Sequence, residues 1–415
     1  MKEIPPLQVF EGVEKRIEVR FSIETIGGEG LRTLTRDQLD QLCERCKCSI
    51  IHHDRTDFFD SYILSESSLF VFVDRVMIKT CGTTVPLDGV DYLIEQARIN
   101  GIEPLDMTYT RSSFLFPDLQ LHPHNDLDQE LEYLSKMSIS GQIVPGKSSI
   151  LGDANGKYWL VHYKDLSSVS RGFETEVPVV TPPHASCRQF SFASGSGQVM
   201  VDVIMTGLDK TVCDQYFKDT SKSDEVNADM MADSLRSILP EFDTISGKCY
   251  DPCGYSCNAF CRDRYFTVHI TPEQAFSYAS VEAVFMEDID ASAFSVPITS
   301  PLNHLTSRST VASDTDDAST NLVNNIFTFI YNVTSLFNPK EALVTMLVKG
   351  DLSSGDARYI ASQLPKYFSV KSSSYAQTVP TITSENLLGE DIVASSVFYS
   401  SVTSGNTGNK PPGLS

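Results

Sequence analysis

The feature that most constrains the fold is a pair of apolar, strand-like runs joined to a short polar turn. The run Leu69–Val73 (LFVFV) follows the turn Leu64–Ser68 (LSESS), and a second run, Val76–Thr80 (VMIKT), begins after two intervening residues. Two β-rich runs with so short a connection predict an antiparallel hairpin. We therefore expect the second run to pair back on the first and to bring Cys81 near the Glu66-Ser67 turn.

The Glu66-Ser67-Ser68 turn has two interpretations. In most proteins a serine in a turn is only a turn residue. Here, however, the hydroxyl of Ser67 follows directly on the carbonyl of its own upstream peptide bond. That arrangement also suits an N-to-O acyl shift, in which the serine attacks the preceding peptide bond.

Groups of strands, each followed by helices, run through the chain and predict an α+β fold. Helices are expected at 35–43, 88–100, 125–137, 209–217, 224–238 and 322–336, and strands at 16–24, 105–116, 187–193, 198–206 and 342–348. Residues 1–402 are interpreted as one domain. Within it, residues 300–320 are rich in Ser, Thr and Asp and are expected to form a mobile insertion. The Gly/Ser/Pro-rich residues 403–415 are expected to be a disordered tail.

The charge balance limits the classes of partner that the chain is expected to bind. The 33 Lys and Arg against 54 Asp and Glu give a formal net charge of −21, which disfavours nucleic acid and anionic membranes. A cationic ligand is weakly favoured, although solubility accounts for much of such charge. The start MKEIPPLQVFEG lacks the apolar core of a signal peptide. No run approaches the roughly 20 apolar residues of a membrane span, so we expect a cytoplasmic protein whose ten cysteines are thiols.

The segment Gly141–Ser148 (GQIVPGKS) spells a phosphate-binding loop. Such a loop works because a strand precedes it and the N-terminus of a helix follows it. Here the expected order is the reverse, a helix before and a strand after. The match is therefore interpreted as a coincidence.

Two other patterns suggest different functions. The segment Gly254–Asn258 (GYSCN) nearly spells the nucleophile elbow of serine hydrolases, with His269 downstream, but its second glycine is missing and no acid is evident. Cysteines recur every four residues, which suggests a metal or iron–sulfur site, but Pro252 and Gly254 break any helix that would align them. The cluster Cys43, Cys46 and Cys48 lacks a second Cys/His pair at the spacing of a zinc finger, so no metal is expected. The cysteines that recur every four residues are Cys249, Cys253, Cys257 and Cys261.

Five separated motifs occur in one order along the chain: FEGVEK (10–15), LSESSLFV (64–71), IKTCGTT (78–84), PCGYS (252–256) and HITPEQAFSYAS (269–280). Together they resemble the eukaryotic S-adenosylmethionine decarboxylase proenzyme family, in its plant-like form. The resemblance implies a four-layer α/β/β/α sandwich of two antiparallel sheets flanked by helices. It also implies self-cleavage into a small chain, 1–66, and a large chain, 67–415. The implied activity is decarboxylation of S-adenosylmethionine, which yields the aminopropyl donor for spermidine and spermine synthesis.

By this resemblance, Ser67 becomes a covalent pyruvoyl cofactor. Its hydroxyl attacks the Glu66 carbonyl, and the ester eliminates and hydrolyses to pyruvoyl and ammonia. Ser256 and Cys81 would assist the acyl shift, and His269 would take the Cα proton. The pyruvoyl carbonyl would form a Schiff base with the substrate amine. The remaining roles in turnover go to the proton donor Cys81 and to two acidic residues, Glu11 and Glu14.

The resemblance also implies a substrate site. Phe10 and Tyr250 would sandwich the adenine, where stacking and the nearby sulfonium both favour aromatic faces. The family often has Phe at the second position, so the Tyr250 hydroxyl needs a partner. Glu273 would accept both ribose hydroxyls, and Glu66 would contact the base through its backbone.

Putrescine is a candidate effector. Animal relatives bind it in an internal acidic pocket, and plant relatives place arginines there. This chain has Arg16 as plant members do, which favours independence of putrescine. The second plant arginine is Thr108 here, however, and acidic residues are kept at pocket-like positions, so activation by putrescine stays open. Arg16 is expected between the sheets with acidic partners at Glu18, Asp202 and Glu282.

One alternative function and the assembly state stay open. The alternative is a catalytically weak paralogue that activates a partner decarboxylase. The intact Ser67, Cys81 and His269 count against it. The assembly is expected to be a monomer or a homodimer.

Overall fold

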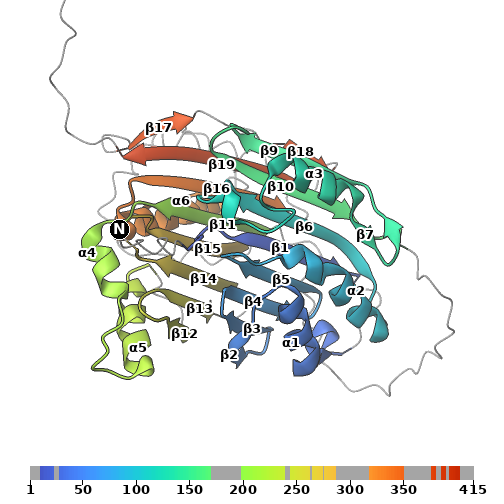
Figure 1. Cartoon of the computed structure of the whole chain (residues 1–415), viewed down its shortest axis with the longest axis horizontal. Coiled ribbons are helices and arrows are strands. Elements are labelled where there is room, and N and C mark those ends of the chain that lie inside the picture. Colours follow the sequence, from blue (N-terminus) through green and yellow to red (C-terminus); the bar gives the residue numbers. More distant parts are fainter. Residues whose placement is uncertain are drawn as a thin grey trace, which may run out of the picture.

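Two large antiparallel sheets dominate the structure (Figure 1). The computed structural model describes residues 10–22, 28–169, 198–238, 244–261, 264–273, 275–286, 317–349, 375–379, 385–388 and 392–401. The strand expected at 187–193, the tail 403–415 and residues 300–316 of the expected insertion lie outside these ranges. Residues 317–320 were wrongly assigned to that insertion, because they form the first turn of a helix that begins at Asp317.

The first sheet comes from the N-terminal part of the chain. Its strands lie in the order β2 (Ile50–Arg55), β3 (Phe59–Leu64), β4 (Ser67–Phe72), β5 (Arg75–Thr80), β1 (Lys15–Phe21), β6 (Pro104–Ser112), β10 (Tyr158–Asp165) and β9 (Gly146–Gly152). The pairing of β4 with β5 confirms the predicted hairpin.

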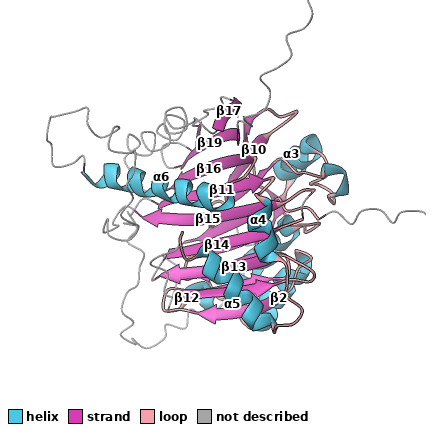
Figure 2. Ribbon diagram, turned by 90° about the vertical axis from the view of Figure 1, so that its left-hand side faces the viewer, coloured by secondary structure: helices cyan, strands magenta, loops and turns pink. Residues whose placement is uncertain are grey.

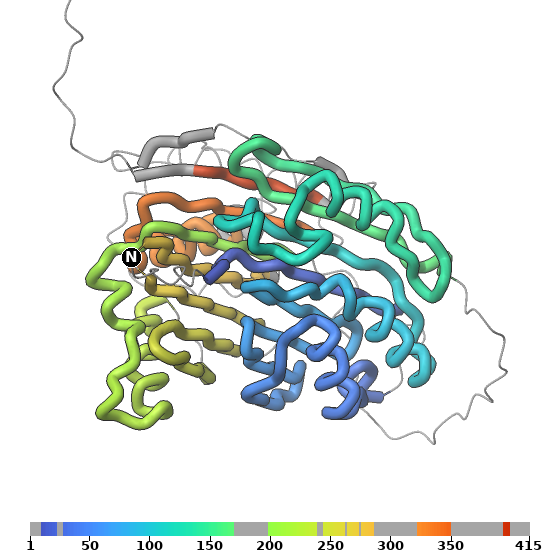
Figure 3. Tube along the Cα trace, viewed as in Figure 1, coloured from blue at the N-terminus to red at the C-terminus, as the bar shows by residue number. Residues whose placement is uncertain are grey.

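The second sheet comes from the C-terminal part, as the change of colour in Figure 3 shows. Its order is β12 (Thr244–Cys249), β13 (Tyr255–Cys261), β14 (Arg264–Thr271), β15 (Tyr278–Met286), β11 (Gln198–Thr206), β16 (Glu341–Lys349), β19 (Ile392–Ser401) and β17 (Tyr375–Val379), with β18 (Glu385–Leu388) also on β19.

Helices cover the outer face of each sheet. The first sheet packs against α1 (Arg36–Arg45), α2 (Val90–Ile99) and α3 (Leu127–Lys136), and the second against α4 (Lys210–Cys213), α5 (Asp224–Leu235) and α6 (Asp317–Phe337) (Figure 2). Short elements complete the list: β7 (Ser138–Ile139), β8 (Gln142–Ile143), η2 (Gly30–Thr33), η3 (Pro86–Gly89), η4 (Pro117–Leu119) and η5 (Asp214–Tyr216).

Three hydrophobic cores separate the layers. One lies between each sheet and its helices, and a third, rich in aromatic side chains such as Phe59, Phe70 and Tyr265, lies between the two sheets. The predicted α+β four-layer sandwich is therefore confirmed. Within the described residues, no helix has the length and apolar character to cross a bilayer.

Local sequence signals explain several elements. The side chain of Thr35 caps α1 and forms a capping box with Gln38. The phosphate-loop spelling at Gly141–Ser148 runs through β8 into β9, so a strand and not a helix follows it. On β1, Ile17 and Val19 pack in the core under the helices, which leaves Arg16 and Glu18 on the face between the sheets.

Candidate active site

Two turns meet at one rim of the sandwich and bring Ser67 and Cys81 together. Ser67 opens β4 and lies opposite Thr80, the last residue of β5, so Cys81 follows directly beside the Glu66-Ser67 bond. The Gly82 amide donates to the Glu11 carbonyl at 2.8 Å, which ties the FEGVEK segment to the same turn. The hairpin register thus builds this corner of the site from three of the motifs.

Ser67 has a strained backbone and a hydroxyl held by a carboxylate. Its φ is +129°, a region that only glycine adopts readily, and its side chain is buried. Such a conformation costs on the order of 1–3 kcal/mol and persists only when the surroundings enforce it. The hydroxyl donates to Glu14 Oε1 at 2.7 Å.

The carbonyl of Glu66, directly upstream of Ser67, faces two donors. The Cys81 backbone N–H lies 2.9 Å from this oxygen, and the Cys81 thiol donates to it at 3.4 Å. Donors placed in this way stabilise negative charge that develops on a carbonyl oxygen. The carbonyl that the family resemblance marks for cleavage therefore has two donors that can stabilise a negative charge on its oxygen.

Glu14 is the only carboxylate bonded to the Ser67 hydroxyl among the described residues. Ser280 Oγ also donates to it, and Lys79 Nζ lies 3.3 Å away. Burial favours a raised pKa for Glu14, but attraction to Lys79 and the hydrogen bonds from Ser280 and Ser67 outweigh burial and hold the pKa below its usual value. Glu14 is therefore a carboxylate that can orient the Ser67 hydroxyl.

His269 lies beside this carboxylate as a neutral imidazole. Its Nδ1 is 2.8 Å from Ser256 Oγ, and its Nε2 is 2.8 Å from Thr267 Oγ1 and 3.6 Å from Glu14 Oε1. Burial lowers the pKa of His269 to about 4. A neutral imidazole can accept a proton.

Cys81 is a protonated thiol. Burial is the main cause that raises the pKa of its thiol well above the usual value, and the nearby Glu66 and Glu14 raise it further. Such a thiol is a proton donor rather than a nucleophile.

Glu11 occupies the neighbouring loop. Its carboxylate accepts hydrogen bonds from the backbone amides of Val13, at 3.0 Å, and Phe116, at 2.7 Å, and burial raises its pKa. These bonds fix Glu11 beside Gly82, but its carboxylate does not contact Ser67.

Three of the four expected substrate-binding residues surround the turn. A Cβ at Gly82 would lie 2.9 Å from Glu66 Oε2 and 3.4 Å from a Phe10 ring carbon, and Gly82 has a φ of +62°. Both reasons require glycine there. The Tyr250 hydroxyl donates to the Leu64 carbonyl at 2.9 Å, which is the partner that the sequence left open. Glu273 follows β14 on the same rim, half buried, and its Oε2 has no hydrogen-bond partner in the described part of the chain.

Behind this rim lies a network of buried charges, here named the interior network: Arg16, Glu18, Lys79, Asp202, Glu282 and Lys349. Arg16 binds Glu282 and Glu18, each at 2.9 Å, as expected. The expectation that Asp202 would partner Arg16 was wrong, because Asp202 binds Lys79 at 2.9 Å. Lys349 binds Glu18 at 2.7 Å and Thr108 Oγ1 at 3.1 Å.

Sequence reasoning missed several members of these clusters. Lys79 is part of the IKTCGTT motif, but a lysine inside a strand carried no signal by itself. Thr267 precedes His269 by two residues on β14, so strand alternation could have placed both on one face. Nothing in the sequence pointed to Lys349.

The serine hydrolase alternative gains a Ser256–His269 contact from the structure, with Glu14 beyond the imidazole. Thr267, and not Glu14, is the nearer partner of His269 Nε2. Glu14 is bonded to Ser67 and Ser280, so it is not available as the acid of a catalytic triad. Among the residues that the structure describes, no group of three or more His, Cys, Asp or Glu is arranged to hold a metal ion.

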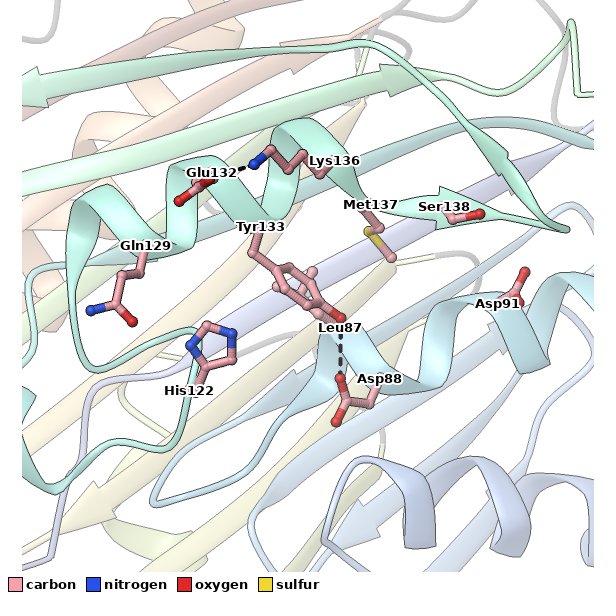
Figure 4. A pocket seen from close by; sticks show the side chains of 10 residues that line it. All are labelled: Leu87, Asp88, Asp91, His122, Gln129, Glu132, Tyr133, Lys136, Met137 and Ser138. Carbon is pink, nitrogen blue, oxygen red and sulfur yellow. Dashed lines mark hydrogen bonds and ion pairs between the residues drawn. The ribbon is translucent and has the colours of Figure 1, made fainter.

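A surface hollow of about 800 Å³ lies apart from the rim, between α2 and α3 (Figure 4). None of the expected site residues lines it. Its acidic side chains are engaged: Asp88 accepts from Tyr133 at 3.3 Å, Asp91 from the Ser140 amide at 2.7 Å, and Glu132 pairs with Lys136.

Comparison with known proteins gives consistent matches. Residues 7–384 match the model of the adenosylmethionine decarboxylase family. The S-adenosylmethionine decarboxylase proenzyme of Ipomoea nil is 36% identical over 279 residues, which cover 66% of this chain and 70% of that protein. The proenzyme of Helianthus annuus is 37% identical over 283 residues, 66% and 71% of the two chains. A crystal structure of the Trypanosoma brucei AdoMetDC-delta26 monomer aligns over 81% of this chain and 99% of its own, with 19% identity and a TM-score of 0.47.

Proposed function

The chain belongs to the adenosylmethionine decarboxylase family, and from that premise we propose that it cleaves itself between Glu66 and Ser67 and then decarboxylates S-adenosylmethionine. The observation that carries the proposal is the pairing of a strained, carboxylate-bound Ser67 with an upstream carbonyl that already faces two donors. The product would be the aminopropyl donor for spermidine and spermine synthesis.

The first step is the acyl shift. Glu14 orients the Ser67 hydroxyl and draws its proton, and the oxygen attacks the Glu66 carbonyl carbon. The oxyanion that forms is stabilised by the Cys81 N–H and thiol. The peptide C–N bond then breaks as the proton held by Glu14 passes to the Ser67 nitrogen, which becomes a free amine. Glu14 is again a carboxylate, and an ester joins Glu66 to the Ser67 side chain. Relief of the positive φ at Ser67 favours this direction.

The second step is elimination. His269, neutral because of its burial, accepts the Cα proton of residue 67, and the ester leaves as the Glu66 carboxylate. The dehydroalanine that remains takes up water and releases ammonia, which leaves the pyruvoyl group at the start of the large chain. The residues present fit this cofactor, since Glu14 and Cys81 contact the Glu66-Ser67 segment and His269 lies beside Glu14.

When formed, the pyruvoyl group supplies an electron sink for the loss of carbon dioxide from the substrate. The residues around it have separate proposed tasks. Cys81, whose raised pKa keeps it protonated, donates a proton to the substrate carbon. Glu11 and Glu14 are the acidic residues for turnover.

We propose that the adenine binds between Phe10 and Tyr250. The hydroxyl of Tyr250 is occupied by Leu64, so its ring is held at the turn. Glu273, half buried and with one oxygen lacking a partner among the described residues, would accept the ribose hydroxyls. Glu66 would contact the base through its backbone.

Activity is proposed to be independent of putrescine. Arg16 and Lys349 already bind the interior carboxylates Glu18 and Glu282. The cavity that remains beside Arg16 and Lys349 measures about 10 Å³, which is room for one water at most. A diamine would have to displace a side chain of the protein to enter.

Two assays with one control test the proposal. The purified chain is expected to run as two bands on denaturing electrophoresis and to release carbon dioxide from carboxyl-labelled S-adenosylmethionine. Ser67→Ala should run as one band and release none. A single-band wild type that decarboxylates, or a two-band Ser67→Ala, would refute it. A single-band wild type that only raises the activity of another decarboxylase would favour the regulatory paralogue.

A further inference from the structure

A chain of buried polar side chains leads from the first sheet to the ring of His269. Ser256 and Asn258 alternate on β13 and lie directly opposite His269 and Thr267 of β14. Residues two apart on a strand share a face, and this face meets Ser68 of β4 in the other sheet. Asn258, Thr267 and Ser68 are fully buried, so their hydrogen bonds are made within the protein and not to solvent.

Asn258 fixes the direction of the first hydrogen bond. Its Nδ2 donates to the Tyr62 carbonyl at 3.1 Å and to Ser61 Oγ at 3.0 Å. Because a carbonyl can only accept, the amide nitrogen must face Tyr62 and the amide oxygen must face Ser68. Ser68 therefore donates its one hydroxyl hydrogen to Asn258 Oδ1, at 2.7 Å.

That direction decides the rest of the chain. Ser68 Oγ can now only accept, and its other neighbours are Thr267 Oγ1 at 3.1 Å and His269 Nε2 at 3.3 Å. If Thr267 donates to Ser68, Nε2 must carry a hydrogen to bond Thr267 Oγ1 at 2.8 Å. If Nε2 carried none, Thr267 would have to donate to it, and Ser68 would lose its donor.

The first arrangement satisfies every member of the chain, which buried polar groups require. A second observation favours it independently. Glu14 Oε1 lies 3.6 Å from Nε2, and a carboxylate attracts a hydrogen on the nitrogen that faces it. The other ring nitrogen, Nδ1, is then without a hydrogen and accepts from the Ser256 hydroxyl at 2.8 Å.

We propose that Asn258, Ser68 and Thr267 are positioning residues that hold the hydrogen of His269 on Nε2, so that Nδ1 is the nitrogen that receives the Cα proton of residue 67 through Ser256. This inference rests on the proposed function, because it assigns these residues to the elimination step of self-cleavage.

The proton balance is as follows. The Ser256 oxygen takes the Cα proton while its own hydrogen passes to Nδ1. The electron pair of the C–H bond forms the C=C bond of dehydroalanine, and the C–O ester bond breaks with its pair on the Glu66 carboxylate. His269 is left with hydrogens on both nitrogens, beside the Glu14 carboxylate, and returns the extra proton to solvent.

The test compares Thr267→Val, which removes the hydroxyl at similar volume, with Thr267→Ser, which keeps it. Thr267→Val should slow the decay of the ester about tenfold, since it disturbs the base without removing it. The stalled ester should be cleavable by hydroxylamine. Thr267→Ser should process like the wild type. Ser68→Ala interrupts the same series of hydrogen bonds at a second place. It should give the same accumulation of ester and serves as the test if Thr267→Val fails to fold.

The tautomer itself can be read by nitrogen NMR of labelled histidine in the uncleaved Ser67→Ala chain. We expect the hydrogen of His269 on Nε2, and a shift toward Nδ1 when Thr267→Val is added. A hydrogen on Nδ1 in Ser67→Ala, or ester decay at the wild-type rate in Thr267→Val and Ser68→Ala, would overturn the inference while leaving self-cleavage intact. A wild type that never forms ester or pyruvoyl would instead remove the proposed function and this inference with it.

Discussion

The rim cluster around Ser67 and the interior network around Arg16 are both buried between the same two sheets, yet they are built from opposite chemistry. The rim cluster combines one carboxylate with a neutral imidazole, a protonated thiol and several hydroxyls. The interior network combines three cations with carboxylates in direct ion pairs. Lys79 joins the two, since it lies 3.3 Å from Glu14 and 3.2 Å from Glu282.

The difference suggests separate tasks: the rim cluster is proposed to carry the reaction, and the interior network to stabilise the structure. In the interior network, burial opposes ionisation of Glu282, but Arg16 and Lys79 outweigh burial and lower its pKa to about 2, so its charge is permanent. Buried ions of this kind hold a structure only while every partner is present. At the rim, burial keeps His269 and Cys81, the proposed base and proton donor, neutral, whereas Glu14 is held as a carboxylate.

The largest expected effect is at the rim. His269→Ala removes the proposed base and should slow elimination by about 10²–10⁴. The chain should stop at the ester, and hydroxylamine should then split it at Ser67. His53→Ala, an exposed histidine that stacks on Tyr62, is the control and should process normally. Normal pyruvoyl formation in His269→Ala would remove His269 from the mechanism.

Cys81→Ala tests both tasks of one thiol. Processing should slow because the Glu66 carbonyl loses one of its two donors, and turnover after processing should fall roughly 100-fold for lack of a proton donor. Pyruvoyl should also be lost during turnover through protonation at the wrong carbon. Rates are measured separately for processing and for carbon dioxide release. Wild-type release by fully processed Cys81→Ala would reject the donor role.

Arg16→Leu breaks the interior network. Removing one partner of buried pairs should lower the free energy of unfolding by about 3–5 kcal/mol, measured by urea denaturation. Arg36→Leu, which removes an exposed pair with Asp40, is the matched control and should cost less than about 1 kcal/mol.

The same variant tests the link between the two regions. Arg16→Leu should process or turn over more slowly, and putrescine should restore part of the loss, whereas the wild type should respond little. Strong stimulation of the wild type by putrescine would contradict the built-in cation, as would wild-type behaviour of Arg16→Leu without it.

The smallest expected effect is at the edge of the rim. Tyr250→Phe loses the hydrogen bond to the Leu64 carbonyl and should cost about 0.5–1.5 kcal/mol of stability. The ring remains for stacking, so the KM for S-adenosylmethionine should change little. Tyr250→Ala should raise KM clearly, and an unchanged KM there would exclude the ring from the adenine site.

The sequence predicted elements better than partners. The family resemblance correctly placed Arg16 and Glu18 between the sheets, and the short link after Val73 correctly predicted the hairpin. The predicted ion pair of Asp202 with Arg16 was wrong, because the partner of Asp202 depends on the register in which the strands pair. Arg16 lies opposite Lys79 on β1 and β5, and Asp202 lies opposite Glu282 on β11 and β15. Arg16 therefore binds Glu282, and Lys79 binds Asp202. Such pairing between strands that are distant in the chain cannot be recognised from the local sequence.

The site shows the same limit. The motifs named Ser67, Cys81, Ser256 and His269, and the structure brings these residues to one rim. The strain at Ser67 and the two donors to the Glu66 carbonyl arise from the meeting of two turns. Neither could be predicted from composition or spacing, since each depends on how β4 begins and how β5 ends.

The most direct test of the central claim is the intact mass of the purified wild-type chain. The account predicts a small chain that ends at Glu66 and a large chain whose first residue is a pyruvoyl group. Together they should weigh more than the full-length chain by one water minus one ammonia. Ordinary hydrolysis would add a whole water and leave serine at the new start. That result, or an active chain that stays whole, would contradict the account.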